Sequence, residues 1–201
     1  MNSEKLSATE SIHLISEVIQ EARVRFEENG VIYVFWGLFI ALISLSQFLL
    51  LTNELYAINW YPYLAIPLGF VFTMYYYWRK KAHRTKNQIS TILSKTWLAL
   101  GVNKMLLGFF FAPALGENLS PIILILLAIG ILVSGIALRS TILIISSVLI
   151  NIAGILCFSV AWLYQPLVLS ASSFIAVMLP GLYMFVKSKK ANRTTSKLKS
   201  A

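Results

Sequence analysis

Residues 120 to 138 read SPIILILLAIGILVSGIAL, an apolar run without a single charged side chain. An α-helix needs about 20 predominantly apolar residues to cross the roughly 30 Å hydrocarbon core of a bilayer. The run has that length and that character. It predicts a helix that spans a membrane, and hence an integral membrane protein.

Apolar segments of similar length lie on both sides of this run. The chain has 58% hydrophobic and 12% charged residues and a mean hydropathy of +0.75, which is not the composition of a water-soluble domain. We expect an all-α polytopic membrane protein with six transmembrane helices within residues 31–187. The expected spans lie at about 31–52, 59–78, 95–114, 120–138, 141–163 and 168–187.

Little of the chain lies outside this domain. Residues 1–30 are predicted to form a cytoplasmic amphipathic helix, and residues 188–201 a basic cytoplasmic tail that we expect to be disordered. The first apolar run begins only at Val31 and follows an acidic stretch rather than a basic one, so we expect no cleaved leader.

The basic residues predict the orientation. Every Lys and Arg except Lys104 falls before the first span, around the connection between spans two and three, at Arg139 after span four, or in the tail. The connections near 53–58, 115–119 and 164–167 carry no Lys or Arg. Cytoplasmic connections are rich in Lys and Arg. We therefore expect a multi-pass protein of the bacterial inner membrane with both termini in the cytoplasm.

Two further features of the cytoplasmic side follow from this orientation. Clusters of Lys and Arg beside a span contact anionic lipid, so Arg79, Lys80, Lys81 and the basic tail are expected to contact the anionic cytoplasmic leaflet. Tryptophan prefers the headgroup level, and Trp36 and Trp97 are expected to mark the same side of the membrane.

The segment from Ser7 to Glu28 predicts a helix, opened by a capping box and closed by Gly30 as a left-handed cap. Its apolar residues recur at three- and four-residue steps on one face. They are Ile12, Ile15, Val18, Ile19, Ala22 and Phe26. Residues 1–30 carry mostly acidic side chains, which anionic lipid repels. We expect the face to contact protein, either the basic loop at 79–86 or a second chain; the alternative is a plain interfacial helix.

The polar residues expected at midplane depth are Asn103, Lys104 and Asn151. A charge there costs on the order of 3 kcal/mol, and the spans contain no carboxylate to pair with Lys104. One hypothesis is a central polar cavity in which Lys104 and Asn151 hold a small anion or a polar solute. The other is that both residues form hydrogen bonds to neighbouring helices and fix their register.

The sequence argues against enzymatic chemistry. It contains no Asp, only two His and one Cys, so paired carboxylates, a zinc-ligand set and a hydrolase triad are not found. We expect no catalytic residues, no metal and no cofactor. The basic clusters are explained by topology and lipid contact, so we expect no nucleic-acid binding.

Small residues and prolines indicate how the spans could pack or bend. Gly130 and Ser134 form a small-xxx-small step, for which general tight packing is the simpler interpretation. Pro67 and Pro180 each remove a backbone hydrogen bond and could kink spans two and six.

Four stretches spread over nearly the whole chain resemble an uncharacterised family of small bacterial six-helix membrane proteins. They are Asn29-Gly30, Trp36-Gly37, Gly135-Ile136-Ala137-Leu138-Arg139 and Leu179-Pro180-Gly181-Leu182. Members of that family tend to be encoded beside small winged-helix transcription regulators, so the resemblance implies a regulatory or sensing role. It brings no functional residues.

Two classes of function stay open. The first is a non-enzymatic regulatory or interaction protein that engages a cytoplasmic partner, or a second copy of the chain, through Ile12, Ile15, Val18, Ile19 and Phe26. The second is a small channel or transporter for an anion or polar solute, with a midplane site near Lys104 and Asn151. The acidic amphipathic helix favours the first, and the unpaired Lys104 favours the second.

Overall fold

The computed structural model describes residues 30–80 and 88–187, and these residues are helices and short turns without a strand. The principal elements, with the one-turn helices between them, follow. They are α2 (Gly30–Thr52), η1 (Tyr56–Ile58), η2 (Tyr61–Ala65), α3 (Ile66–Lys80), α4 (Gln88–Phe110), α5 (Ala112–Leu115), η4 (Gly116–Asn118), α6 (Leu119–Ala137), α7 (Thr141–Cys157), η5 (Trp162–Tyr164), α8 (Gln165–Ser173) and the π turn η6 (Phe174–Met178). The helix continues after η6 to Lys187. We call Gln165 to Lys187 the C-terminal helix.

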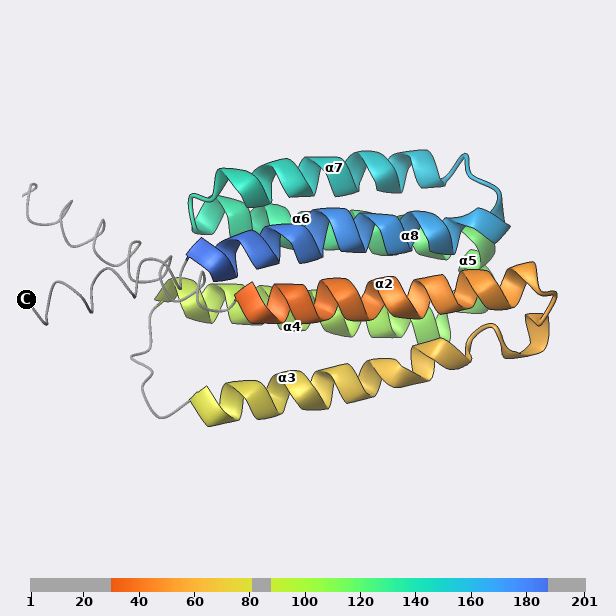
Figure 1. The fold of residues 1–201 in the computed structure, drawn as a ribbon, viewed down its shortest axis with the longest axis horizontal. Helices are drawn as coiled ribbons and strands as arrows, with labels where there is room; N and C mark the ends of the chain where they lie inside the picture. Colours follow the sequence, from red (N-terminus) through yellow and green to blue (C-terminus); the bar gives the residue numbers. More distant parts are fainter. Residues whose placement is uncertain (1–29, 81–87, 188–201) are drawn as a thin grey trace, which may run out of the picture.

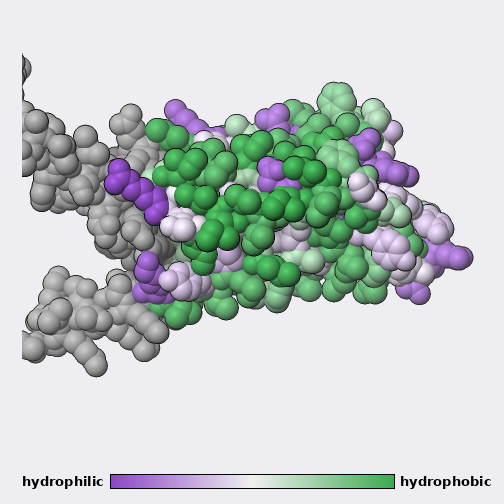
Figure 2. All heavy atoms as spheres, turned by 90° about the horizontal axis from the view of Figure 1, so that it is seen from above, coloured by the Kyte–Doolittle hydropathy of each residue, from purple (hydrophilic) through white to green (hydrophobic). Residues whose placement is uncertain are grey.

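Three helical segments are long and apolar enough to cross a bilayer: Gly30–Thr52, Ala112–Ala137 and Trp162–Lys187. Helix α7 is apolar but shorter. Figure 2 shows a broad apolar surface between two ends where polar side chains gather. Such a band matches the hydrocarbon layer between two aqueous faces. The chain is therefore an all-helical, membrane-embedded protein.

The long helices lie side by side along the longest dimension of the molecule (Figure 1). The start of α2, the α6–α7 connection and the end of the C-terminal helix share one end. The connections that contain η1, η2, α5 and η5 share the other. Arg79, Arg139 and Lys187 therefore lie toward the first end, and Glu54 and Glu117 lie toward the second. We call the first the basic end.

Two helix pairs approach so closely that their backbones nearly touch. A Cβ added to Gly37 of α2 would lie 2.5 Å from the Met178 backbone nitrogen, and one added to Gly181 would lie 2.8 Å from the Val34 nitrogen. In the α6–α7 pair, a Cβ on Gly135 would lie 3.0 Å from the Ile144 nitrogen. Small residues permit this approach where van der Waals packing holds membrane helices together.

The core lies between α2, α6, α7 and the C-terminal helix. Its most buried large side chains are Leu51, Leu124, Ile131, Leu138, Leu143 and Ile150. Helix α4 joins this core through Trp97 and Leu100, which lie against Gly130 of α6. The small-xxx-small step at Gly130 and Ser134 thus accepts another helix of the same chain.

The prediction of a left-handed cap at Gly30 is wrong. Gly30 is the first residue of α2, and Gly116 is the glycine with positive φ among the residues that the structure describes. A Cβ on Gly30 would lie 2.6 Å from the carbonyl oxygen of Gly181 and 2.8 Å from the Phe185 nitrogen. The position requires glycine because of this close approach, and not because of its own backbone conformation.

Several helix limits differ from the expected spans. The beginning of the 59–78 segment consists of 3₁₀ turns, and α3 starts only at Ile66. Helix α4 begins at Gln88 and ends at Phe110, while α7 ends at Cys157. Apolar composition measures what a residue tolerates around it, and it does not distinguish a helix from an apolar turn that follows one.

Neither proline interrupts a long helix. Pro67 is in the first turn of α3, where a backbone N–H has no intrahelical partner to lose. Pro180 follows the π turn, in which the Leu179 N–H donates to the Phe174 carbonyl five residues back. The wider turn changes the backbone hydrogen-bonding register just before the residue that lacks a donor.

Candidate functional site

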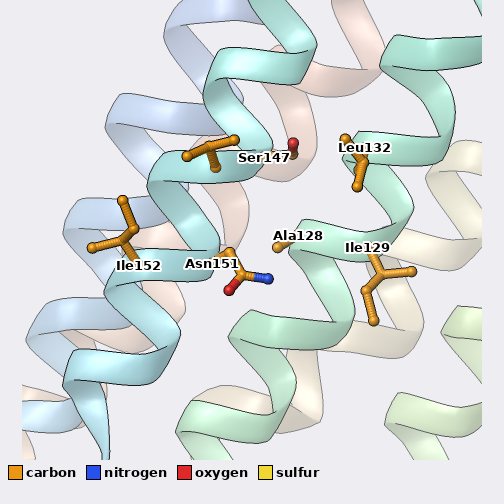
Figure 3. A pocket seen from close by; sticks show the side chains of 7 residues that line it. Ala128, Ile129, Leu132, Ser147, Asn151 and Ile152 are labelled. Atoms are coloured by element: carbon orange, nitrogen blue, oxygen red, sulfur yellow. The ribbon is translucent and has the colours of Figure 1, made fainter.

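Asn151 lies in a groove between α6 and α7. The groove has a volume of about 270 Å³, and three of its lining residues come from α6 and four from α7. They are Ala128, Ile129 and Leu132 of α6 and Ser147, Val148, Asn151 and Ile152 of α7. Figure 3 shows the Asn151 amide extending from α7 toward the Ala128 side of the groove.

The groove has a small, buried floor and apolar rims. Ala128 and Ser147 are both 2% exposed, whereas Val148 and Ile152 are half exposed. The Ser147 hydroxyl donates a 2.7 Å hydrogen bond to the carbonyl of Ile144 in its own helix. Asn151 forms no hydrogen bond with any residue in 30–80 or 88–187. The groove therefore offers a free amide among apolar side chains.

The other two predicted site residues lie on α4 and are not in this groove. Asn103 is exposed, and its Nδ2 donates to the carbonyl of Ala99 at 2.9 Å, so its amide is partly satisfied within its own helix. Lys104 is half buried, and no ion pair or hydrogen bond joins it to the described parts of the chain. A cavity shared by Lys104 and Asn151 stays a prediction.

Tryptophans form polar contacts between helices that sequence reasoning did not identify. Trp97 Nε1 donates to Ser134 Oγ at 3.0 Å, which joins α4 to α6. Trp36 Nε1 donates to Thr73 Oγ1 at 2.9 Å, which joins α2 to α3. The only signal in the sequence was an indole in one apolar segment and a hydroxyl in another, and it does not specify which pair meets.

Another polar contact ties α2 to the C-terminal helix. Ser170 Oγ donates to the carbonyl of Ala41 at 2.9 Å, in a buried environment. Gln165 Nε2 donates to the carbonyl of Val160 at 3.2 Å and so holds the start of α8 against the turn after α7. These contacts stabilise helix pairing, and they leave no open polar path in the part of the core that they occupy.

Some predicted functional residues cannot be placed. Ile12, Ile15, Val18, Ile19 and Phe26 lie outside the described residues, as do Lys81 and the tail. Arg79 is described and exposed, and its guanidinium lies 5.7 Å from the centre of the Tyr75 ring. This contact is a cation–π interaction at the basic end.

The described residues contain no cluster of three or more His, Cys, Asp or Glu side chains that could hold a metal ion. Cys157 is fully buried in the core. No known protein family, curated protein or solved structure matches the chain. The function is therefore inferred from the chemistry of the chain itself.

Proposed function

We propose that this chain is a non-enzymatic regulatory or interaction protein of the membrane, which binds a cytoplasmic protein partner through the apolar face of residues 7–28. The observation that supports the proposal is the contact of Gly30 with Gly181 and Phe185. It places the start of α2 against the C-terminal helix near its end. Segments 1–29 and 188–201 therefore leave the helices at neighbouring points.

Charge supports a composite surface at this end. Residues 1–29 carry most of the Glu residues of the chain, whereas the tail is basic. Arg79, Arg139 and Lys187 add positive charge at the same end of the helices. Opposite charges that emerge close together attract one another. An acidic amphipathic segment beside a basic surface is suited to a protein partner more than to anionic lipid.

The proposal includes a topology. The chain crosses the bacterial inner membrane six times, with α3, α4 and α7 as the spans additional to the three most apolar segments. The basic end then faces the cytoplasm together with both termini, in agreement with the positive-inside tendency. A non-permeant label that reacts with either terminus in intact cells contradicts this orientation.

The partner is tested by affinity capture of the full chain from cells in mild detergent. We expect a reproducible cytoplasmic protein that is lost when Ile15 and Phe26 are both replaced by Glu. The matched control is His13→Glu with Gln20→Glu, which adds the same two charges to the opposite face of the predicted helix. Recovery of the chain alone, or equal loss in both double variants, refutes the proposal.

Lys104 favours a second candidate function, passage or binding of an anion. It is a half-buried cation in α4 without an ion pair in the described residues, and a charge in hydrocarbon needs water or a counter-ion. Halide flux into liposomes that contain the purified protein tests this function. We expect flux that Lys104→Met abolishes and that Lys95→Met, at an exposed position of the same helix, preserves. Flux no greater than in empty liposomes excludes it.

A further inference from the structure

The groove between α6 and α7 opens onto an exposed apolar surface. Several α7 side chains around it are about half exposed, among them Val148, Ile152 and Ile155. Ile129 and Leu132 of α6 are also exposed on its other rim. Figure 2 looks onto the side that carries α7 in Figure 1, and it shows mostly apolar atoms there, with a small polar patch among them. Lipid chains satisfy the apolar side chains of such a surface equally well, so these side chains alone do not specify an occupant.

Asn151 is the exception on this surface. Its amide contains two N–H donors and a carbonyl acceptor, and none of them is paired with a described residue. Residue 151 lies well inside α7, which runs from Thr141 to Cys157. Acyl chains offer neither donors nor acceptors, so a polar group at this depth is stabilised by a polar partner.

We propose that a second copy of this chain covers the groove, with the Asn151 amides of the two copies hydrogen-bonded to each other. An amide is self-complementary, because its N–H donates to the carbonyl of an identical group while its carbonyl accepts the N–H of that group. Two copies inserted in the same orientation are related by a two-fold axis along the membrane normal, which brings equivalent residues to the same depth. Asn151 therefore meets Asn151.

The shape of the groove suits such a pair. The small floor residues Ala128 and Ser147 lie below the rims that Ile129 and Val148 form. Small residues between larger ones allow an apolar side chain of a second helix to enter, and a polar pair then fixes the register. The proposed interface is therefore distinct from the face of residues 7–28, and it does not depend on the proposed function.

The test measures self-association of the full chain in liposomes by energy transfer between differently labelled copies. We expect Asn151→Leu to weaken the dimer about tenfold, as for the loss of a hydrogen-bonded polar pair between membrane helices. Asn103→Leu is the control, because Asn103 is exposed on α4 and its amide donates within that helix. Val148→Trp obstructs the groove sterically and should weaken the dimer without removal of the amide.

Cross-linking locates the interface independently of any fold defect in the Asn151 variant. In a Cys157→Ser background, Ile152→Cys should form a covalent dimer, whereas Met74→Cys on the exposed surface of α3 should not. A monomeric protein at all lipid dilutions overturns the proposal. So does a dimer that forms the link at residue 74 but not at 152, that Asn151→Leu leaves intact, or that is replaced by a lipid retained in the groove.

Discussion

Helix α2 contacts two neighbours in opposite ways. Against the C-terminal helix it presents Gly30 and Gly37, and the two backbones approach to the limit that a missing Cβ allows. Against α3 it presents Phe35 and Trp36, whose rings pack on Phe72 and Phe70. The first contact has no adjustable part, because backbone atoms face backbone atoms. The second consists of rings that rotate and shift. The difference separates a rigid pair of helices from an adaptable attachment.

Exposure agrees with this contrast. On α3, Met74 is 78% exposed and Trp78 is 72% exposed, so this helix attaches to the others along a narrow strip. The C-terminal helix has buried residues along most of its length, from Gln165 to Met184. Regions with few buried contacts open at lower free energy than the core. We therefore expect α3 to separate from the other helices before α2 separates from the C-terminal helix.

The largest effect is expected from Gly37→Ala, which adds a Cβ at 2.5 Å from the Met178 nitrogen. The helices must move apart, and we expect a loss of about 2 to 3 kcal/mol in the free energy of unfolding, measured in mixed detergent micelles. The same change at Gly69 of α3 places a Cβ at 2.8 Å from the movable ring of Phe39 and should cost about 1 kcal/mol.

Gly101→Ala is the control for both variants. A Cβ there would lie 3.7 Å from the Phe70 ring, an ordinary contact, so the change should be neutral or stabilise the protein slightly. Equal losses at Gly37 and Gly69 would remove the distinction between a rigid and an adaptable interface.

A smaller effect is expected from Ser134→Ala in the core. The change removes the acceptor of Trp97 Nε1 and leaves the indole N–H without that bond, for a loss of about 1 kcal/mol. Ser44→Ala is the counterpart, because the buried hydroxyl of Ser44 has no hydrogen-bond partner in the described structure. We expect that change to be neutral or slightly stabilising. Thermal unfolding of the two variants in one detergent checks the pair, and an equally large loss at Ser44 would be contradictory.

The smallest effect is expected where α3 joins α2. Trp36 and Thr73 form the hydrogen bond between these helices, and a double-mutant cycle with Trp36→Phe and Thr73→Val should give a coupling energy of about 0.6 kcal/mol. The cycle measures unfolding free energy of the two single variants and the double variant. A coupling energy of zero would show that aromatic packing alone attaches α3.

Composition and periodicity predicted the class of the molecule from segments such as 120–138, because burial in lipid demands apolar length that any reader of the sequence can count. The glycine contacts were not predictable in the same way. Gly30 was interpreted through its local backbone, whereas its requirement comes from Gly181, about 150 residues away along the chain. A residue's partners in space are set by tertiary packing, which local patterns do not encode.

The candidate site shows the same limit. Asn151 was identified because a polar side chain is unusual in an apolar segment, and the structure adds that it lies in the α6–α7 groove. Depth along a helix follows from residue number, but the direction in which a side chain faces depends on the neighbours that surround the helix. The proposed pairing of Lys104 with Asn151 used depth alone, and the groove contains neither Lys104 nor Asn103.

The contact between Gly30 and Phe185 also has a consequence for engineering the chain. The two extremities of the helical bundle meet, so a short peptide can join residue 187 to residue 30 without crossing the molecule. New termini between Lys80 and Gln88 would open at the same end, since α3 finishes and α4 starts there. Such a circular permutant keeps the direction of every helix and detaches the order of synthesis from the architecture.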